Sequence, residues 1–338
     1  MKRTLSRLTC AAILALTVLS GAALAETPVK FTLDWKFEGP AAAYCIAADK
    51  GYFKDEGLSV TIDSGNGSAG AVNRVATGAY DIGFADINAL IEFNAQNPDK
   101  ALKAVFMVYD NPPFAIFSLK KNNIVKPADL AGKTLGAPIF DAPRKTFPAF
   151  CQATGLNPAS VTWQTMDPPL REPMLVRGDV QAISGFYFTS LLNLEQAGVK
   201  AEDLNIFKYP DYGVKLYGNA IVVSPALAKK PEVVKGFLRA VAKGWKEVAQ
   251  DPKAAMVFVK KRDGLIDPAL EEKRLRLCLE MCIATPFVKA NGMGPVDPAR
   301  MARAIQEAAS SFGLKTAPKP EEVFDASFMP GKEERTIF

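Results

Sequence analysis

The segment VATGAYDIGF, residues 75–84, contains the end of a helix, a glycine, a short buried strand and a turn. A similar order recurs in LVRGDVQAISGF, residues 175–186. Glycine often follows the last turn of a helix, because it adopts the left-handed conformation without strain. Two copies of one helix–glycine–strand unit predict two similar α/β lobes. Chance likeness between two common turns is the alternative interpretation.

Strands and helices are predicted to alternate on both sides of these two segments. The apolar periodicity predicts strands at residues 29–35, 58–63, 81–85, 102–109, 114–119, 134–137, 161–164, 180–184, 205–209 and 217–223. It predicts intervening helices at residues 40–50, 69–77, 86–96, 143–154, 170–177 and 188–196. Beyond Pro225 the chain is predicted to be helical almost to Gly313, and a charged, proline-rich tail from Thr316 is expected at the surface. This rhythm predicts parallel or mixed sheets covered by helices.

The first 25 residues differ from the rest of the 338-residue chain. Lys2, Arg3 and Arg7 precede an uncharged, mostly apolar run that ends in Ala-Leu-Ala before Glu26. This pattern predicts a cleaved secretory signal peptide at residues 1–25 and a mature protein in the periplasm. A membrane anchor is the alternative, since a run of this length nearly spans a bilayer.

The charge balance argues against a nucleic-acid partner. Without Lys2, Arg3 and Arg7 the 41 basic residues fall to 38, against 36 acidic ones, which leaves a net charge of +2. A nearly neutral chain has no electrostatic basis for binding a polyanion.

The chain has no histidine, which restricts its chemistry. Histidine is the commonest general base and metal ligand, and Ser–His and Cys–His nucleophile pairs are impossible without it. The four cysteines after the signal are not spaced as zinc ligands. We therefore expect no catalytic residue, no metal and no cofactor. Cys278 and Cys282 lie one helical turn apart, and whether they form a disulfide in an oxidising compartment stays open.

Candidate ligand-binding residues follow the predicted strands, because ligands of open α/β sheets bind beyond the carboxyl ends of strands. Aromatic side chains at these positions suit a mostly apolar pocket with a few hydrogen bonds. The aromatic candidates are Trp35, Phe37, Tyr109, Phe140, Tyr187, Phe188 and Tyr212. The other candidates are Gly65, Asn66, Gly67 and Ser68 of one glycine-rich turn, together with Asp86, Asp110, Asp141 and Arg144.

Arg144 is the charged candidate among them. A guanidinium at the start of a predicted helix can hold a carboxylate or sulfonate through two hydrogen bonds, and a surface ion pair with Asp141 is the alternative. Arg74, Arg171 and Arg177 fall within predicted helices and are expected to be solvated. The glycine-rich turn lacks the spacing of phosphate-binding loops, so it either offers backbone N–H groups to a ligand or is only a turn.

Several segments together carry a resemblance to a known family. They are Leu33-Asp34-Trp35, AADKGYFKDEGL at residues 47–58, the turn at 65–68, GFAD at 83–86 and DLAGKTLG at 129–136. With them the chain resembles ABC-transporter solute-binding proteins of the nitrate/sulfonate/taurine group, which includes binding proteins for thiamine pyrimidine precursors.

The resemblance implies a two-lobed clamshell, the type II periplasmic binding-protein fold, with a mixed sheet flanked by helices in each lobe. It implies one lobe from residues 26–115 plus 220–338 and another from residues 116–219. Hinges near residues 111–113 and 213–214 are expected to let the lobes close on a ligand.

The same resemblance implies a non-catalytic periplasmic protein that delivers a small molecule to an ABC permease of the inner membrane. We expect a monomer whose cleft holds a pyrimidine-like heterocycle or a sulfonate or carboxylate anion. The Leu-Asp-Trp opening is most similar to the pyrimidine-precursor branch, although that branch has a histidine after the tryptophan and this chain does not.

Two other functions are compatible with this scaffold. An enzyme would need a base among Asp86, Asp110 and Asp141, with Cys45 as nucleophile. A ligand-sensing domain would bind its ligand in the same cleft and signal through a membrane partner.

Overall fold

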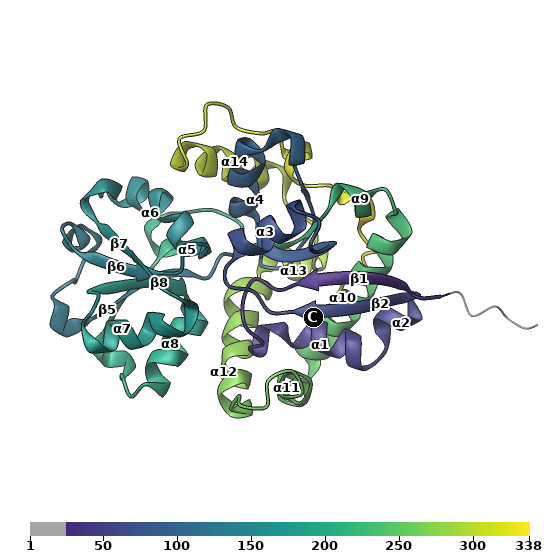
Figure 1. Ribbon diagram of the computed structural model, residues 1–338, viewed down its shortest axis with the longest axis horizontal. Coiled ribbons are helices and arrows are strands. Elements are labelled where there is room, and N and C mark those ends of the chain that lie inside the picture. The colour runs from purple at the N-terminus through teal and green to yellow at the C-terminus, as the bar shows by residue number, and fades with distance from the viewer. Residues whose placement is uncertain (1–24) are drawn as a thin grey trace, which may run out of the picture.

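Two five-stranded sheets form the centres of two adjoining lobes in the computed structural model, which describes residues 25–338 (Figure 1). The predicted signal peptide therefore lies outside the described residues, except for Ala25. Each sheet is mixed and covered by helices, so the predicted fold class is confirmed.

The two sheets have the same topology. The first follows the order β2-β1-β3-β10-β4, with β1 at Thr27–Thr32, β2 at Leu58–Asp63, β3 at Ile82–Asp86, β4 at Lys103–Met107 and β10 at Asn219–Val223. The second follows the order β7-β6-β8-β5-β9, with β5 at Phe114–Leu119, β6 at Thr134–Ala137, β7 at Thr162–Thr165, β8 at Ala182–Phe186 and β9 at Leu204–Lys208. In each sheet the first three strands are parallel, and the fourth runs antiparallel to both of its neighbours.

The internal repeat seen in the sequence has a structural counterpart. Residues 75–84 lead from α3 into β3, and residues 175–186 lead from α7 into β8. Strands β3 and β8 both occupy the third position of their sheets, next to the antiparallel strand. Gly78 and Gly178 end the two helices with φ of 77° and 89°, as the left-handed cap requires. The two α/β units are therefore equivalent parts of two similar lobes.

The helices fill the positions expected from the sequence, with local differences. Those up to β10 are α1 (Ala42–Asp49), α2 (Tyr52–Asp55), α3 (Ser68–Ala76), α4 (Ile87–Gln96), α5 (Ala142–Lys145), α6 (Phe147–Thr154), α7 (Arg171–Arg177) and α8 (Tyr187–Gln196). The single helix predicted over 143–154 is divided at Thr146, where Pro148 enters the first turn of α6 and has no N–H to continue the previous helix.

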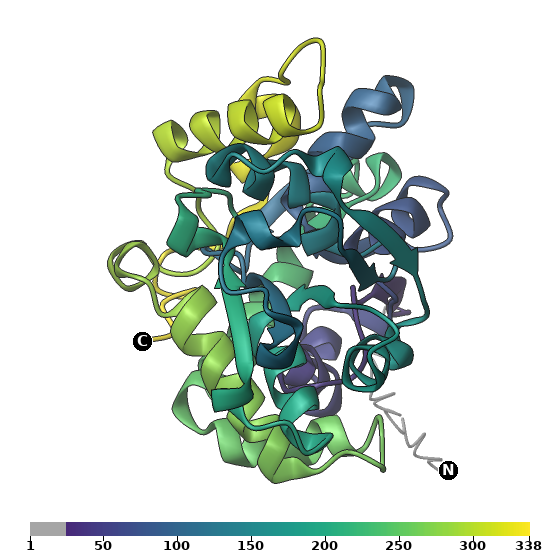
Figure 2. The same cartoon turned by 90° about the vertical axis from the view of Figure 1, so that its left-hand side faces the viewer.

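After β10 the chain is almost entirely helical. The elements are α9 (Pro225–Ala228), α10 (Pro231–Gln250), α11 (Pro252–Lys260), α12 (Pro268–Cys278), α13 (Pro286–Asn291), α14 (Pro298–Ser311) and α15 (Pro320–Val323). Figure 2, which views the molecule from the side of the second lobe, shows these green to yellow segments along one side of it.

The tail is more buried than expected. Val323 and Phe324 are buried, and Phe324 forms a parallel bridge with Ala104 of β4. Charged residues and prolines flank this apolar pair, and they led to the expectation that the whole tail lies at the surface. That expectation was wrong at Val323 and Phe324.

Aromatic side chains pack the core of the first lobe between its sheet and helices α1 and α10. Tyr44 of α1 lies 5.0 Å from Phe31 and 6.1 Å from Trp245, measured between ring centroids. All three are fully buried, and aromatic pairs of this geometry add to the stabilisation from burial. The four described cysteines are also buried and are free thiols.

Helices α1 and α10 approach closely at Gly244. A Cβ atom placed on Gly244 would lie 2.1 Å from the backbone oxygen of Ala43. Gly244→Ala should therefore lower the free energy of unfolding by about 2 kcal/mol or more, although alanine is favoured over glycine in an unobstructed helix. Chemical denaturation measures this.

Gly264→Ala is the matched control, because a Cβ at Gly264 would meet nothing within 4 Å. We expect it to change the unfolding free energy by less than about 0.5 kcal/mol. An equal effect of the two substitutions would show that the contact with Ala43 does not limit packing.

Candidate ligand-binding site

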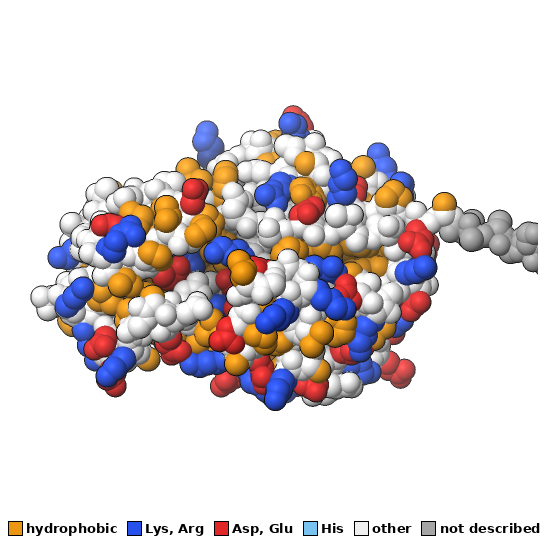
Figure 3. All heavy atoms as spheres, turned by 60° about the horizontal axis from the view of Figure 1, so that its bottom comes forward, with side chains coloured by type: hydrophobic (Ala, Val, Ile, Leu, Met, Phe, Trp, Pro, Cys, Tyr) orange, Lys and Arg blue, Asp and Glu red, His pale blue; other side chains and the backbone are white. Residues whose placement is uncertain are grey.

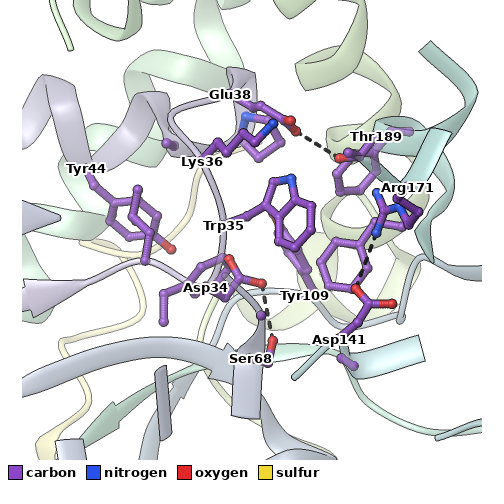
Figure 4. A pocket seen from close by; sticks show the side chains of 18 residues that line it. Asp34, Trp35, Lys36, Glu38, Tyr44, Ser68, Tyr109, Asp141, Arg171 and Thr189 are labelled. Atoms are coloured by element: carbon purple, nitrogen blue, oxygen red, sulfur yellow. Dashed lines mark hydrogen bonds and ion pairs between the residues drawn. The ribbon is translucent and has the colours of Figure 1, made fainter. Parts of the chain in front are cut away.

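A pocket of about 540 Å³, a volume that includes space open to solvent, lies between the two lobes. Six residues expected from the sequence line it: Trp35, Gly67, Ser68, Tyr109, Asp141 and Phe188. The lining also includes side chains that sequence reasoning did not select, chiefly Asp34, Lys36, Glu38, Tyr44, Phe84, Arg171, Phe186 and Thr189. Figure 4 shows Glu38, Thr189, Arg171 and Asp141 around the indole of Trp35, with Tyr44 on the other side of the Asp34 loop.

The loop after β1 carries Trp35 into this cavity. Strands β1 and β2 are parallel neighbours, so the loops at their carboxyl ends lie together. Backbone hydrogen bonds join them: the N–H of Gly65 donates to the oxygen of Trp35 at 2.9 Å, and the N–H of Gly67 donates to that of Asp34 at 2.7 Å. The glycine-rich turn therefore supports the loop that presents Trp35.

The same turn also touches the second lobe. The N–H of Ala69 donates to the backbone oxygen of Phe140 at 3.2 Å. Gly67 has φ of 134°, and a Cβ there would lie 2.4 Å from the oxygen of Phe140. Both the backbone conformation and the lack of space require glycine at this position.

Asp34 is a buried carboxyl at the cavity wall. Its Oδ2 accepts hydrogen bonds from Asn219 Nδ2 at 2.7 Å and from Ser68 Oγ at 3.3 Å. Burial raises the pKa of Asp34 to about 7, although these two hydrogen bonds oppose the rise. The carboxyl group therefore changes charge near neutral pH.

Arg171 forms the opposite wall with two acids of the second lobe. Its guanidinium is 1% exposed and lies 5.0 Å from the Trp35 ring, so it makes a cation–π contact across the cleft. Its Nε donates to Glu172 Oε1 at 2.9 Å, and its NH1 donates to Asp141 Oδ1 at 3.4 Å. Burial raises the pKa of Asp141 to about 6, and the charge of Arg171 opposes this rise.

A second buried arginine joins the lobes beside the cavity. Arg274 of α12 donates to the backbone oxygens of Phe188 and Thr189 at 3.1 and 3.0 Å, and to Glu271 Oε2 at 2.9 Å. Thr189 in turn donates to Glu38 Oε2 at 2.9 Å. Because these partners belong to both lobes, the structure has the lobes closed on one another.

Nine residues expected from the sequence do not line the cavity: Phe37, Gly65, Asn66, Asp86, Asp110, Phe140, Arg144, Tyr187 and Tyr212. Asp86 caps α4 by accepting from the N–H of Asn88 at 3.0 Å. Asp110 pairs with Arg300 at 3.0 Å. Tyr187 stacks on Phe117, and Tyr212 packs against Phe150 within the second lobe.

Arg144 and Arg171 both lie in environments other than those expected from the sequence. Arg144 does not line the cavity, whereas Arg171 does. Arg144 NH1 donates to the backbone oxygen of Ala137 at 2.9 Å and to Thr165 Oγ1 at 3.0 Å, and its guanidinium lies over Trp163. Arg171, expected to be solvated, is buried, so that expectation was wrong. It is the first residue of α7, and its position before an acidic neighbour, Glu172, is the signal that could have identified it.

Charged side chains of both signs are mixed on the surface seen in one view. On the face shown in Figure 3, Lys and Arg alternate with Asp and Glu. Within residues 25–338 no His, Cys, Asp or Glu side chains gather in threes as metal ligands would. None of the helices in the same range is both long and apolar enough to cross a membrane.

A closed two-lobed cleft between sheets of this topology is the architecture of type II periplasmic binding proteins. The family model described as NMT1/THI5 like matches residues 40–255. The chain belongs to this family.

The relatives include binding proteins and enzymes. The formylaminopyrimidine-binding protein of Halalkalibacterium halodurans is 26% identical over 75% of this chain and 77% of its own length. The riboflavin-binding protein RibY of Chloroflexus aurantiacus is 27% identical over 86% of this chain and 82% of its own length. The 4-amino-5-hydroxymethyl-2-methylpyrimidine phosphate synthase of Legionella pneumophila is 22% identical over 68% of this chain and 72% of its own length.

Solved structures share the fold. The alkanesulfonate-binding protein SsuA of Xanthomonas axonopodis pv. citri, bound to MOPS, matches with a TM-score of 0.68 at 15% identity, over 89% of this chain and 99% of that one. The periplasmic nitrate-binding protein NrtA of Synechocystis PCC 6803 matches with a TM-score of 0.60 at 12% identity, over 90% of this chain and 87% of that one.

The raised pKa of Asp34 predicts a pH-dependent stability of the ligand-free protein. The folded pKa of about 7 lies above the ordinary value, so the stability contributed by the protonated carboxyl is complete below the unfolded pKa and is lost as pH rises through 7. Asp34→Asn cannot ionise and should reduce the loss of unfolding free energy between pH 5 and pH 8 by about 2 to 3 kcal/mol.

Denaturation at the two pH values tests this, with Asp99→Asn as the control because Asp99 is solvent-exposed. An identical pH dependence in the Asp34→Asn variant and the natural protein would contradict the assignment.

Proposed function

We propose that this protein is the periplasmic substrate-binding component of an ABC importer, and that its ligand is a planar nitrogen heterocycle of the pyrimidine or flavin type. The observation that carries the proposal is an aromatic cavity with a titratable carboxyl, Asp34, in its wall. The signal-like N-terminal pattern supports export to the periplasm, and the protein acts there as a monomer.

The aromatic lining of the cavity favours flat rings. Trp35, Tyr109, Phe186 and Phe188 come from both sides of the cleft, and all four line the cavity. Their faces provide apolar contact for a ring, while carboxylate oxygens accept hydrogen bonds from its amino or imino groups. The ligands named for two relatives, a formylaminopyrimidine and riboflavin, both contain such rings.

The distribution of charge disfavours the alternative, a sulfonate or carboxylate anion. Arg171 is the buried cation of the lining, and Glu172 and Asp141 already lie 2.8 and 3.4 Å from its nitrogens. Asp34 and Glu38 add further acidic groups to the wall. A buried anion needs an uncompensated cation, and Lys36 is exposed at the edge of the cavity.

Enzymatic function is the second candidate, because some relatives are synthases. The residues that such an enzyme would need are not gathered in the cavity. Cys45 is buried in α1, Asp86 caps α4, Asp110 pairs with Arg300, and only Asp141 lines the cavity. Binding without turnover is therefore the function that the arrangement favours. A sensor domain would use the same pocket and differ in its membrane partner.

A thermal-shift screen of the protein without residues 1–25 tests the ligand class. The panel contains 4-amino-5-hydroxymethyl-2-methylpyrimidine, riboflavin, an alkanesulfonate and nitrate. A ligand that binds only the folded state adds about 2.7 kcal/mol of stability at a hundredfold excess over its Kd. We expect a heterocycle to raise the Tm and the two anions to leave it unchanged.

Mass spectrometry of the recovered heterocycle separates binding from catalysis. We expect it unchanged after incubation. If only the anions raised the Tm, the proposed ligand class would be wrong. If the heterocycle were recovered in converted form, the protein would be an enzyme.

Trp35→Ala tests the stacking surface. If the indole contacts the bound ring, its loss should weaken binding by about 2 kcal/mol, roughly 30-fold in Kd, measured by isothermal titration calorimetry. Phe37→Ala is the control, since Phe37 is on the same loop but packs against the core of the first lobe. Equal losses in both variants would mean that Trp35 only supports the loop.

A further inference from the structure

Tyr44 has a hydroxyl group without a hydrogen-bond partner. The residue lies in the middle of α1, is fully buried and lines the cavity. Among the described residues, its oxygen is one of a few buried side-chain polar atoms that neither donate nor accept a hydrogen bond. Leaving a polar atom unpaired in the interior is unfavourable, so such an atom in a cavity wall calls for an explanation.

The described surroundings of Tyr44 do not supply an acceptor for its hydroxyl hydrogen. Phe31, Phe84 and Trp245 pack against its ring. The indole Nε1 of Trp245 is the nearby donor and lowers the pKa of Tyr44, but neither atom has a hydrogen bond of regular geometry. A phenylalanine would make the same ring contacts without the unpaired oxygen. Within the described residues, the hydroxyl hydrogen therefore has no acceptor in the ligand-free protein.

Asp34 lies on the side of the cavity toward which the Tyr44 hydroxyl points (Figure 4). The hydrogen bonds from Asn219 and Ser68 both go to Oδ2 of Asp34, so Oδ1 has no side-chain donor within residues 25–338. Burial and the nearby charge of Asp34 keep the pKa of Tyr44 well above its ordinary value, so the phenol keeps its proton. This part of the wall thus combines a donor and an acceptor.

We propose that Tyr44 is a specificity-determining residue whose hydroxyl donates to a ring nitrogen of the ligand, while Asp34 Oδ1 accepts from an amino group on the adjacent ring carbon. The pair reads an amidine edge, a ring nitrogen beside an amino-bearing carbon, as in 4-aminopyrimidines. This inference rests on the proposed function and narrows its ligand class.

Two probes that differ by one atom test the contact. Both carry the hydroxymethyl and methyl groups of 4-amino-5-hydroxymethyl-2-methylpyrimidine. One is an aminopyridine with nitrogen beside the amino-bearing carbon, and the other is the aniline with C–H at that position. Their affinities are measured by calorimetry for the natural protein and for Tyr44→Phe, at a pH above the pKa of both probes.

We expect the natural protein to bind the aminopyridine about 10-fold more tightly than the aniline, which corresponds to the loss of one hydrogen bond. In Tyr44→Phe this ratio should fall below about 2-fold. Tyr212→Phe is the matched control, because Tyr212 packs inside the second lobe, and it should keep the full ratio.

Stability of the ligand-free variants separates recognition from a structural role. Tyr44→Phe should melt at the same temperature as the natural protein or higher, because no hydrogen bond is lost. A clearly lower Tm would mean that the hydroxyl and Trp245 hold a buried water instead, and a ratio that survives in Tyr44→Phe would also overturn the inference.

The proposed function can stand if this inference fails. Equal affinity of the natural protein for the two probes would refute the amidine contact while keeping a heterocycle-binding protein. If the natural protein bound riboflavin but neither probe, the amidine contact would also be refuted and a heterocycle-binding protein would also remain. Binding of no heterocycle at all would refute both.

Discussion

The parallel pairing of β1 with β2 and β3, repeated by β6 with β7 and β8, determines where a ligand can bind. Parallel strands end at one edge of a sheet, so the loops that follow them are gathered there. In this protein both gathered edges face the gap between the lobes. The backbone bonds from Gly65 and Gly67 to the loop after β1 then hold Trp35 in that gap. The cavity is thus a consequence of sheet topology, and its chemistry depends on which side chains the loops present.

The sequence predicted the order of strands and helices along the chain and six of the residues that line the cavity. Period-2 and glycine-cap patterns identify elements regardless of long-range contacts, and the equivalence of residues 75–84 and 175–186 followed from them. The direction of a side chain after a strand does not follow from such patterns. Trp35 and Phe37 share one loop, yet only Trp35 reaches the cavity, because Phe37 packs against the first lobe. Tyr44 lies in an alanine-rich predicted helix and was not among the candidates, and only the three-dimensional structure shows that its hydroxyl is unpaired.

Buried charge explains why the helix pattern alone did not distinguish Arg144 from Arg171. An arginine on a short helix is usually solvated, since removing its charge from water requires acidic partners in the fold. Arg171 has them in Glu172, its neighbour in sequence, and in Asp141, which a separate loop brings close. Arg144 follows Asp141 closely in the sequence, but its guanidinium donates to Thr165 and lies over the Trp163 ring of its own lobe. The deciding contact in each case joins residues distant in sequence.

The two buried arginines also connect ligand binding to closure. Arg171 contacts Trp35 across the cleft, and Arg274 donates to Phe188 and Thr189 from the opposite lobe. Opening the lobes would separate these groups and return both guanidinium surfaces to water, which compensates much of the lost attraction. The closed cavity contains the unpaired Tyr44 hydroxyl and Trp35 Nε1. A ligand that pairs those atoms favours the closed form alone, and this differential interaction is what selects one state over another.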